Sequence, residues 1–133
     1  MKTRTALIVM LLLIAACGDD DTSPDGPTEV TVALDDFAFV PATIEVSAGV
    51  QVTVNVTNIG GIQHSWILIA GGDEVTNEAE FSEAVIHAGT GDLDPGQSES
   101  VTFTAPEAGT YQIVCHISGH IAAGMVGTLE VSG

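Results

Sequence analysis

The chain has 133 residues, which is enough for one domain with a hydrophobic core and leaves no room for a second. It carries 18 acidic residues against two basic ones, a formal net charge of −16. Because such a surface repels phosphates and anionic headgroups, the composition excludes nucleic-acid binding. Two interpretations of the acidity stay open: steering of a basic partner such as a cytochrome, or adaptation to a saline medium. The absence of Lys and Arg after residue 4 favours the second.

Residues 1–16 have the pattern of an export signal. Lys2 and Arg4 form a basic start, an apolar stretch runs from Ala6 to Ile14, and small residues precede Cys17. The stretch is short for a membrane-spanning helix, which needs roughly 20 residues. The run Ile14-Ala15-Ala16-Cys17 resembles the bacterial lipobox. This resemblance implies a lipoprotein signal peptide over residues 1–16 and lipidation of Cys17. The protein would then be exported and held to a membrane by lipid alone, in the periplasm or on the outer cell surface. An ordinary cleaved signal with an incidental cysteine is the alternative.

Residues 17–29 are polar, acidic and interrupted by prolines, which predicts a flexible tether between the lipid and the domain. From residue 30 to residue 133, short β-branched runs alternate with turn residues. The pattern predicts an all-β, antiparallel sandwich of about seven or eight strands. The predicted strands are Val30–Leu34, Thr43–Val46, Val50–Thr57, Ser65–Ala70, Ser98–Thr104, Gly109–Cys115 and Gly127–Val131. Residues 71–91 differ, because apolar residues between Asn77 and His87 lie near helical spacing, so a short helix is possible there.

Metal-binding side chains gather between residues 115 and 125. Cys115, His120 and Met125 supply a thiolate, an imidazole and a thioether within eleven consecutive residues. Two imidazoles, one thiolate and a weak axial Met form the trigonal electron-transfer copper site. His64 is the candidate for the second imidazole. His116 is expected to lie outside the site, since neighbouring residues project differently from the backbone, and His87 is expected on the surface.

Several segments together resemble the cupredoxins, the small blue copper proteins. The resemblance rests on Asp36–Pro41, Ile44–Gly49, Val56–Asn58, His64, Ala105–Tyr111 and Cys115–Gly127, and it covers most of the chain from Val30 onward. The Cys-x4-His-x4-Met spacing is similar to that of auracyanins and rusticyanin, with a longer loop than plastocyanins have. The resemblance implies a cupredoxin-like Greek-key sandwich holding one type 1 copper. It also implies that His64, Cys115 and His120 are the equatorial ligands and Met125 the axial ligand.

The resemblance further implies a monomeric one-electron carrier that shuttles between membrane-associated redox partners, such as a cytochrome or a respiratory or photosynthetic complex. It places an apolar docking face around the second His ligand. Mapped onto this chain, that face consists of Ile59, Gly60, Gly61, Ile62, Ile117, Ile121, Ala122 and Ala123. Many cupredoxins have Asn after the first His ligand. This chain has Ser65 there, so the residue next to the ligands can differ in its hydrogen bonding.

Two other classes of function compete with the carrier. A copper storage or delivery module without a redox role is the alternative, although a closed site with a Cys ligand is suited to retaining its metal. An enzyme is not expected. Copper nitrite reductases and multicopper oxidases need further His clusters, which His87 and His116 do not supply, and a binuclear centre needs two site cysteines.

Overall fold

The computed structural model describes residues 26–133. The predicted signal peptide 1–16, the lipidation site Cys17 and most of the predicted tether 17–29 lie outside the described residues. At the end of that predicted tether, Thr28 and Glu29 belong to the first strand rather than to a linker. Strand β1 therefore begins two residues before the predicted domain start at Val30.

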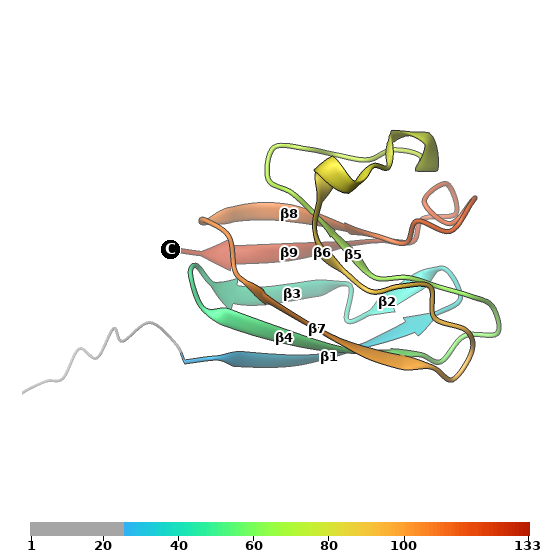
Figure 1. Ribbon diagram of the computed structural model, residues 1–133, viewed down its shortest axis with the longest axis horizontal. Helices are drawn as coiled ribbons and strands as arrows, with labels where there is room; N and C mark the ends of the chain where they lie inside the picture. The colour runs from blue at the N-terminus through green and yellow to red at the C-terminus, as the bar shows by residue number, and fades with distance from the viewer. Residues whose placement is uncertain (1–25) are drawn as a thin grey trace, which may run out of the picture.

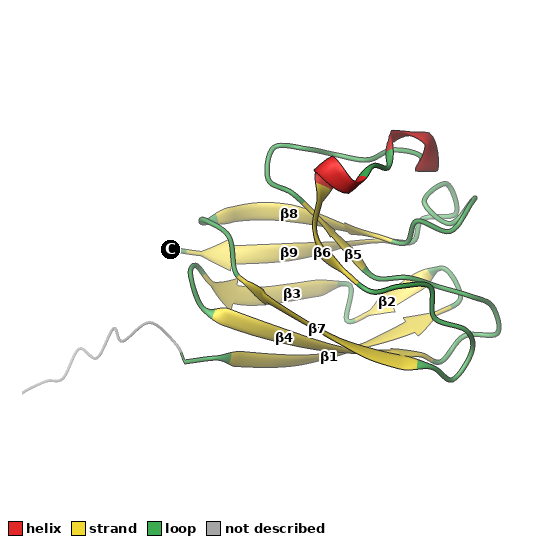
Figure 2. Cartoon of the chain, in the orientation of Figure 1, coloured by secondary structure: helices red, strands yellow, loops and turns green. Residues whose placement is uncertain are grey.

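The described residues form two β-sheets packed face to face (Figures 1 and 2). One sheet has the order β2-β1-β4-β7 and the other has the order β3-β9-β8-β5-β6. The strands of the first sheet are β1 (Thr28–Asp35), β2 (Ala38–Val40), β4 (Gln51–Asn58) and β7 (Ser98–Thr104). Those of the second sheet are β3 (Thr43–Ser47), β5 (Ile67–Ile69), β6 (Ile86–Gly89), β8 (Gly109–Val114) and β9 (Val126–Ser132). The predicted all-β sandwich is confirmed.

Strand pairing is mixed, which corrects the expectation of a wholly antiparallel sandwich. β1 pairs with β4 in parallel, and β3 pairs with β9 in parallel. The remaining pairs are antiparallel. The seven predicted strands are all present, and β2 and β6 bring the described total to nine. These two strands have only three and four residues, too few for a recognisable alternation.

Residues 71–85 lie outside the second sheet, where Figure 2 draws the short helices, and residues 86–89 form β6 at the edge of that sheet. The possible short helix takes the form of two single-turn 3₁₀ helices, η1 (Glu78–Glu80) and η2 (Glu83–Val85). Asn77 caps η1 by accepting a hydrogen bond from the backbone N–H of Ala79 at 3.0 Å. The chain then continues into β6. Within the described residues, no helix is long and apolar enough to cross a membrane.

The core lies between the two sheets and explains the alternation along β4. Val52, Val54 and Val56 are at most 1% exposed, whereas the residues between them face outward. From the neighbouring sheet, the fully buried Trp66 stacks on Phe103 with ring centroids 6.3 Å apart. The same core cluster includes the side chains of Cys115 and Met125. The candidate metal ligands are thus part of the packed interior.

Candidate metal centre

Strand pairing brings the candidate ligands to one end of the sandwich. Residues 115–125, here called the ligand loop, connect β8 to β9, whose ends pair through Val114 and Val126. β5 pairs with β8 in antiparallel register, with Ile67 opposite Val114. Because the two strands run in opposite directions, the residues before Ile67 lie next to the residues after Val114. This register places His64 and Ser65 beside Cys115. In Figure 1 the ligand loop lies at the end of the sandwich away from the C-terminus.

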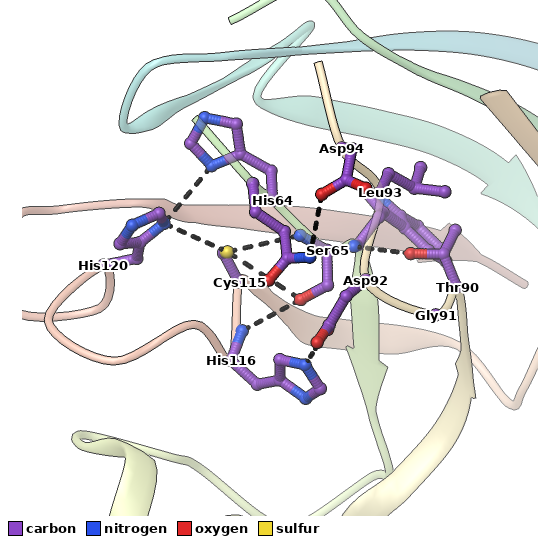
Figure 3. Close-up of polar contacts among 12 residues, drawn as sticks. His64, Ser65, Thr90, Gly91, Asp92, Leu93, Asp94, Cys115, His116 and His120 are labelled. Carbon is purple, nitrogen blue, oxygen red and sulfur yellow. Dashed lines mark hydrogen bonds and ion pairs between the residues drawn. The ribbon is translucent and has the colours of Figure 1, made fainter. Parts of the chain in front are cut away.

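His64, Cys115 and His120 form one buried cluster, here called the ligand cluster. Their potential ligand atoms all lie within 4.8 Å of one another. The Nδ1 atoms of the two imidazoles are 3.2 Å apart, and Nδ1 of His120 is 3.3 Å from Sγ of Cys115. Figure 3 shows the His64 ring directed toward His120, and the His120 ring directed toward both His64 and the sulfur atom. Both His64 and Cys115 are inaccessible to solvent, and His120 is 6% exposed. Two nitrogens and one sulfur thus converge in a buried cluster.

Met125 closes the ligand loop and is also fully buried. Its backbone N–H donates to the carbonyl of His120 at 2.9 Å, and its carbonyl accepts from the N–H of Cys115 at 3.4 Å. Gly119 and Gly124 have φ angles of 83° and 95°, a left-handed conformation that favours glycine. These two turns let the loop double back, so that Cys115, His120 and Met125 all lie at the same end of the core.

Ser65 connects the two chain segments that carry the cluster (Figure 3). Its backbone N–H donates to Sγ of Cys115 at 3.4 Å, and its hydroxyl lies 3.8 Å from the same sulfur. The hydroxyl also accepts a hydrogen bond from the backbone N–H of His116 at 3.1 Å. Ser65 is fully buried. It therefore links the segment of His64 to the ligand loop with a shorter side chain than Asn.

Burial favours the neutral form of the His120 imidazole. Burial lowers the pKa of His120, and the nearby His64 lowers it further, with Glu78 and Asp36 partly opposing this change. A neutral imidazole has a free lone pair, as a metal ligand requires. On the other side of His64, Nε2 lies 3.2 Å from Oδ1 of Asp36. Hydrogen bonds from His64 and from the backbone of Gly61 lower the pKa of Asp36.

The two remaining histidines lie outside the cluster. His116 directs its ring away from the sulfur, forms a contact with Asp92, and packs edge-on against Phe81 with ring centroids 5.1 Å apart. His87 is exposed, with Nε2 3.2 Å from the carbonyl of Thr104. Neither imidazole therefore shares a ligand position with Cys115.

The eight predicted docking residues do not share one environment. Ile59 and Ile62 are 59% and 41% exposed, Gly61, Ala122 and Ala123 are also exposed, and Gly60 and Ile117 are partly buried. Ile121 does not match the prediction of an exposed docking residue. It is only 8% exposed and packs in a second core cluster with Ile67, Ile69, Val75 and Val114, because the loop turns its side chain inward.

Phe37 is a site residue that the sequence interpretation missed. It lies at the tip of the turn between β1 and β2, is 43% exposed, and has a φ of 61°. Its ring meets His120 edge-on, with centroids 5.0 Å apart. Left-handed backbone is unusual for a bulky residue and marks positions that the surrounding structure holds in place. The Asp36–Pro41 motif carried this residue, but nothing in its spacing placed the ring beside His120.

Comparison with known proteins identifies the family. The sequence profile described as "Copper binding proteins, plastocyanin/azurin family" matches residues 27–132. The chain belongs to this family. The predicted membership of the cupredoxins is therefore confirmed, and the match covers the whole sandwich together with the ligand cluster.

Individual relatives agree with the family. Auracyanin-B of Chloroflexus aurantiacus is 35% identical over 126 residues, covering 83% of this chain and 54% of that protein. Auracyanin-A of the same bacterium is 29% identical over 147 residues and covers 90% of each. The chain thus spans about half the length of the first relative and most of the second. The reduced auracyanin of the photosynthetic bacterium Roseiflexus castenholzii superimposes with a TM-score of 0.72 at 30% identity, covering 79% of this chain and 97% of that one.

The donor set fits the cofactor of the family. A thiolate and two imidazoles suit copper in either oxidation state, and the cluster is buried as a cupredoxin copper site requires. The arrangement of His, Cys, His and Met is suitable for one type 1 copper per chain. The cupredoxin fold, the auracyanin relatives and this cluster together support blue copper electron transfer as the function.

Proposed function

We propose that His64, Cys115, His120 and Met125 bind the copper ion of this electron carrier. The observation that carries the proposal is the convergence of His64 Nδ1, His120 Nδ1 and Cys115 Sγ in one buried cluster. Met125 would supply the thioether donor, because it is buried and its backbone is hydrogen-bonded to both Cys115 and His120. When bound, the copper supplies a one-electron Cu(II)/Cu(I) couple.

The protein's role is to hold the ligands in one arrangement for both oxidation states. The ligand loop joins two paired strands, and the opposite side of the cluster is fixed by β5. Ser65 is proposed to keep these two segments together and to donate to the thiolate. Ligands that need not move when the electron arrives lower the reorganisation energy. No coordination position is left for a substrate in this scheme, so the proposed role is a carrier and not an enzyme.

The partners are proposed to be redox proteins that dock on the apolar face around His120. Phe37 contacts His120, and Phe37, Ile59 and Ile62 are all exposed and uncharged. A partner can approach such a face with little cost in desolvating charge, and a small contact of this kind favours brief encounters. We further propose that lipid at Cys17 holds the exported protein to a membrane. The lipobox resemblance supports this location.

Copper binding to the variants below tests the proposal. Adding Cu(II) to the purified protein should give an intense visible charge-transfer band from the thiolate, together with the paramagnetic resonance signal of a type 1 site. Cys115→Ser should abolish the band. His120→Gln should abolish or strongly alter it, whereas His116→Gln, in the same loop, should leave it unchanged. A colourless wild-type product, or loss of the band in the His116 variant alone, would contradict the ligand assignment.

The alternative of copper storage or delivery predicts a different behaviour of the same sample. A storage or delivery site releases its metal to a chelator, whereas a carrier keeps it while cycling between oxidation states. We expect slow loss of copper to an excess of chelator and a reversible one-electron voltammetric wave. Rapid release without a reversible wave would instead support delivery.

A further inference from the structure

We propose that Asp36 is a positioning residue for the copper centre, whose carboxylate orients His64 and stabilises the oxidised state. This inference rests on the proposed copper site and assigns a role to a residue outside the ligand set. Asp36 directly follows β1 at the turn before β2, far from His64 in the sequence. The two residues meet only because this turn lies at the same end of the sandwich as the ligand cluster.

The contacts of His64 determine which nitrogen is free for a metal. Nε2 of His64 lies 3.2 Å from Oδ1 of Asp36, while Nδ1 lies 3.2 Å from Nδ1 of His120. An ionised carboxylate only accepts hydrogen bonds, so Nε2 must carry the proton. The lone pair of the neutral ring is then on Nδ1, which faces the cluster. Asp36 therefore selects the tautomer that ligation needs, by the same arrangement in which carboxylates orient metal-binding histidines in other sites.

The contact between Asp36 and His64 is built into the surrounding backbone. Oδ1 of Asp36 also accepts the backbone N–H of Gly61 at 2.9 Å. A Cβ atom on Gly60 would clash with that same carboxylate oxygen and lie only 3.0 Å from Nε2 of His64. This position therefore leaves no space for a side chain beside the hydrogen bond.

Asn58 holds the same turn from the interior. It is fully buried, its amide donates to the carbonyls of Ile62 and Leu93 at 2.8 Å each, and its carbonyl oxygen accepts from Gly60 N–H at 2.9 Å. The turn over residues 58–62 is thus bonded to Asn58 on its inner side and to Asp36 on its outer side. The Asp36 carboxylate is therefore held by two contacts, with the backbone N–H of Gly61 and with Nε2 of His64.

The chemistry gives the sign of the effect. A carboxylate that accepts the ring proton would make the imidazole a stronger electron donor, and its negative charge lies across the His64 ring from Nδ1, the proposed donor atom. Both effects favour Cu(II) over Cu(I) and lower the reduction potential. The side chain of Asp36 is 47% exposed, so solvent and salt partly screen its charge. The hydrogen bond is screened less, because Nε2 of His64 is buried.

Asp36→Asn is the decisive variant, because it removes the charge and keeps an oxygen that can accept from His64. Asp35→Asn is the matched control. The Asp35 carboxylate is adjacent in sequence and exposed, and it accepts a hydrogen bond from the backbone N–H of Asp36 instead of contacting a histidine. We expect Asp36→Asn to lower the ratio of Cu(II) to Cu(I) affinity about tenfold, a rise of about 59 mV in the one-electron potential. Asp35→Asn should change the ratio less than about twofold.

A nuclear magnetic resonance measurement tests the orientation directly, on protein with copper in the Cu(I) state. The wild type should show a slowly exchanging His64 Nε2–H proton. Asp36→Ala should lose this protection and Asp36→Asn should keep part of it, while Asp35→Asn should match the wild type. If Asp36→Ala does not fold, Asp36→Asn still tests the inference through its reduction potential and its His64 proton exchange.

Three outcomes separate the hypotheses. Equal shifts of potential in the two Asn variants would overturn the inference and leave only a general charge effect. Unchanged potential and proton exchange in Asp36→Asn would also overturn it, with the proposed copper function intact. Failure of the wild type to form a type 1 site would instead contradict the proposed function itself.

Discussion

The hydroxyl group of Ser65 shows how one residue can contribute to both stability and the metal centre. It is buried and accepts the backbone N–H of His116 at 3.1 Å, while the Ser65 backbone N–H donates to the sulfur of Cys115. Removal of the hydroxyl leaves the amide of His116 without this acceptor. A partly buried donor without its partner costs roughly 1–2 kcal/mol.

We therefore predict that Ser65→Ala lowers the free energy of unfolding of the copper-free protein by about 1–2 kcal/mol. Chemical denaturation followed by circular dichroism measures this change. Ser98→Ala provides the control, because that hydroxyl is exposed and forms its hydrogen bond with the hydroxyl of Thr57 on the protein surface. Its effect should stay within about 0.5 kcal/mol. Similar losses in the two variants would mean that Ser65 acts as an ordinary surface hydroxyl does.

At the scale of single residues, chemistry and scarcity pointed to the candidate ligands, since the sequence offers few soft donors after the leader. Cys115, His120 and Met125 share one short run, and His64 was the remaining histidine that matched the family motif. Asp36 and Phe37 could not be assigned a contact from sequence. Their positions beside the two imidazoles depend on the turn between β1 and β2, which local patterns do not place relative to the ligand loop.

The short helix η1 has a measurable connection to the ligand loop. Oε1 of Glu78 accepts the backbone N–H of Gly119 at 2.8 Å. Hydrogen bonds from its own backbone N–H and from that of Gly119 lower the pKa of Glu78 below its ordinary value of 4.5. A carboxyl whose pKa is lowered on folding stabilises the protein above its unfolded pKa, and this contribution is lost as pH falls through the folded value.

We predict that the amide proton of Gly119 shifts as pH falls below 4.5, following the titration of Glu78. Nuclear magnetic resonance of the copper-free protein measures both groups. Glu78→Gln should remove this titration, and its deficit in unfolding free energy relative to the wild type should be present at pH 7 and shrink at lower pH. An unchanged Gly119 titration in Glu78→Gln would show that the segment 71–91 does not hold the loop through this carboxylate.

Elements with a clear alternation were predictable, and the others depended on tertiary structure. Val52, Val54 and Val56 gave β4 its register directly. β2 and β6 are too short to show a pattern, and their residues become strands only by pairing with β1 and β5. The direction of pairing was also inaccessible. The parallel pairs β1–β4 and β3–β9 join segments separated by other strands, so no hairpin turn signals them.

For the whole molecule, the distribution of charge decides how the acidity acts on a partner. Acidic residues occur on both sheets, and some face each other, as Glu45 and Glu130 do in the register of β3 and β9. Others lie near the cluster, as Asp35 does at the end of β1. A distant partner therefore responds to the total negative charge, whereas a docked partner responds mainly to the carboxylates nearest to it. The Debye length is about 30 Å at 0.01 M ionic strength and about 8 Å at 0.15 M.

These lengths predict how two variants affect electron transfer with a basic cytochrome. At 0.01 M, Asp35→Asn and Glu130→Gln should slow the reaction by similar small factors, since the partner then responds to total charge. At 0.15 M, only Asp35→Asn should slow it, by about twofold, because Asp35 is two residues from Phe37, whose ring contacts His120. Glu130 lies toward the opposite end of the sandwich, near the end of β9 (Figure 1). Stopped-flow rates over both ionic strengths measure the difference. No effect of either variant at 0.15 M would mean that the acidity does not steer partners at that salt and serves solubility in a saline medium.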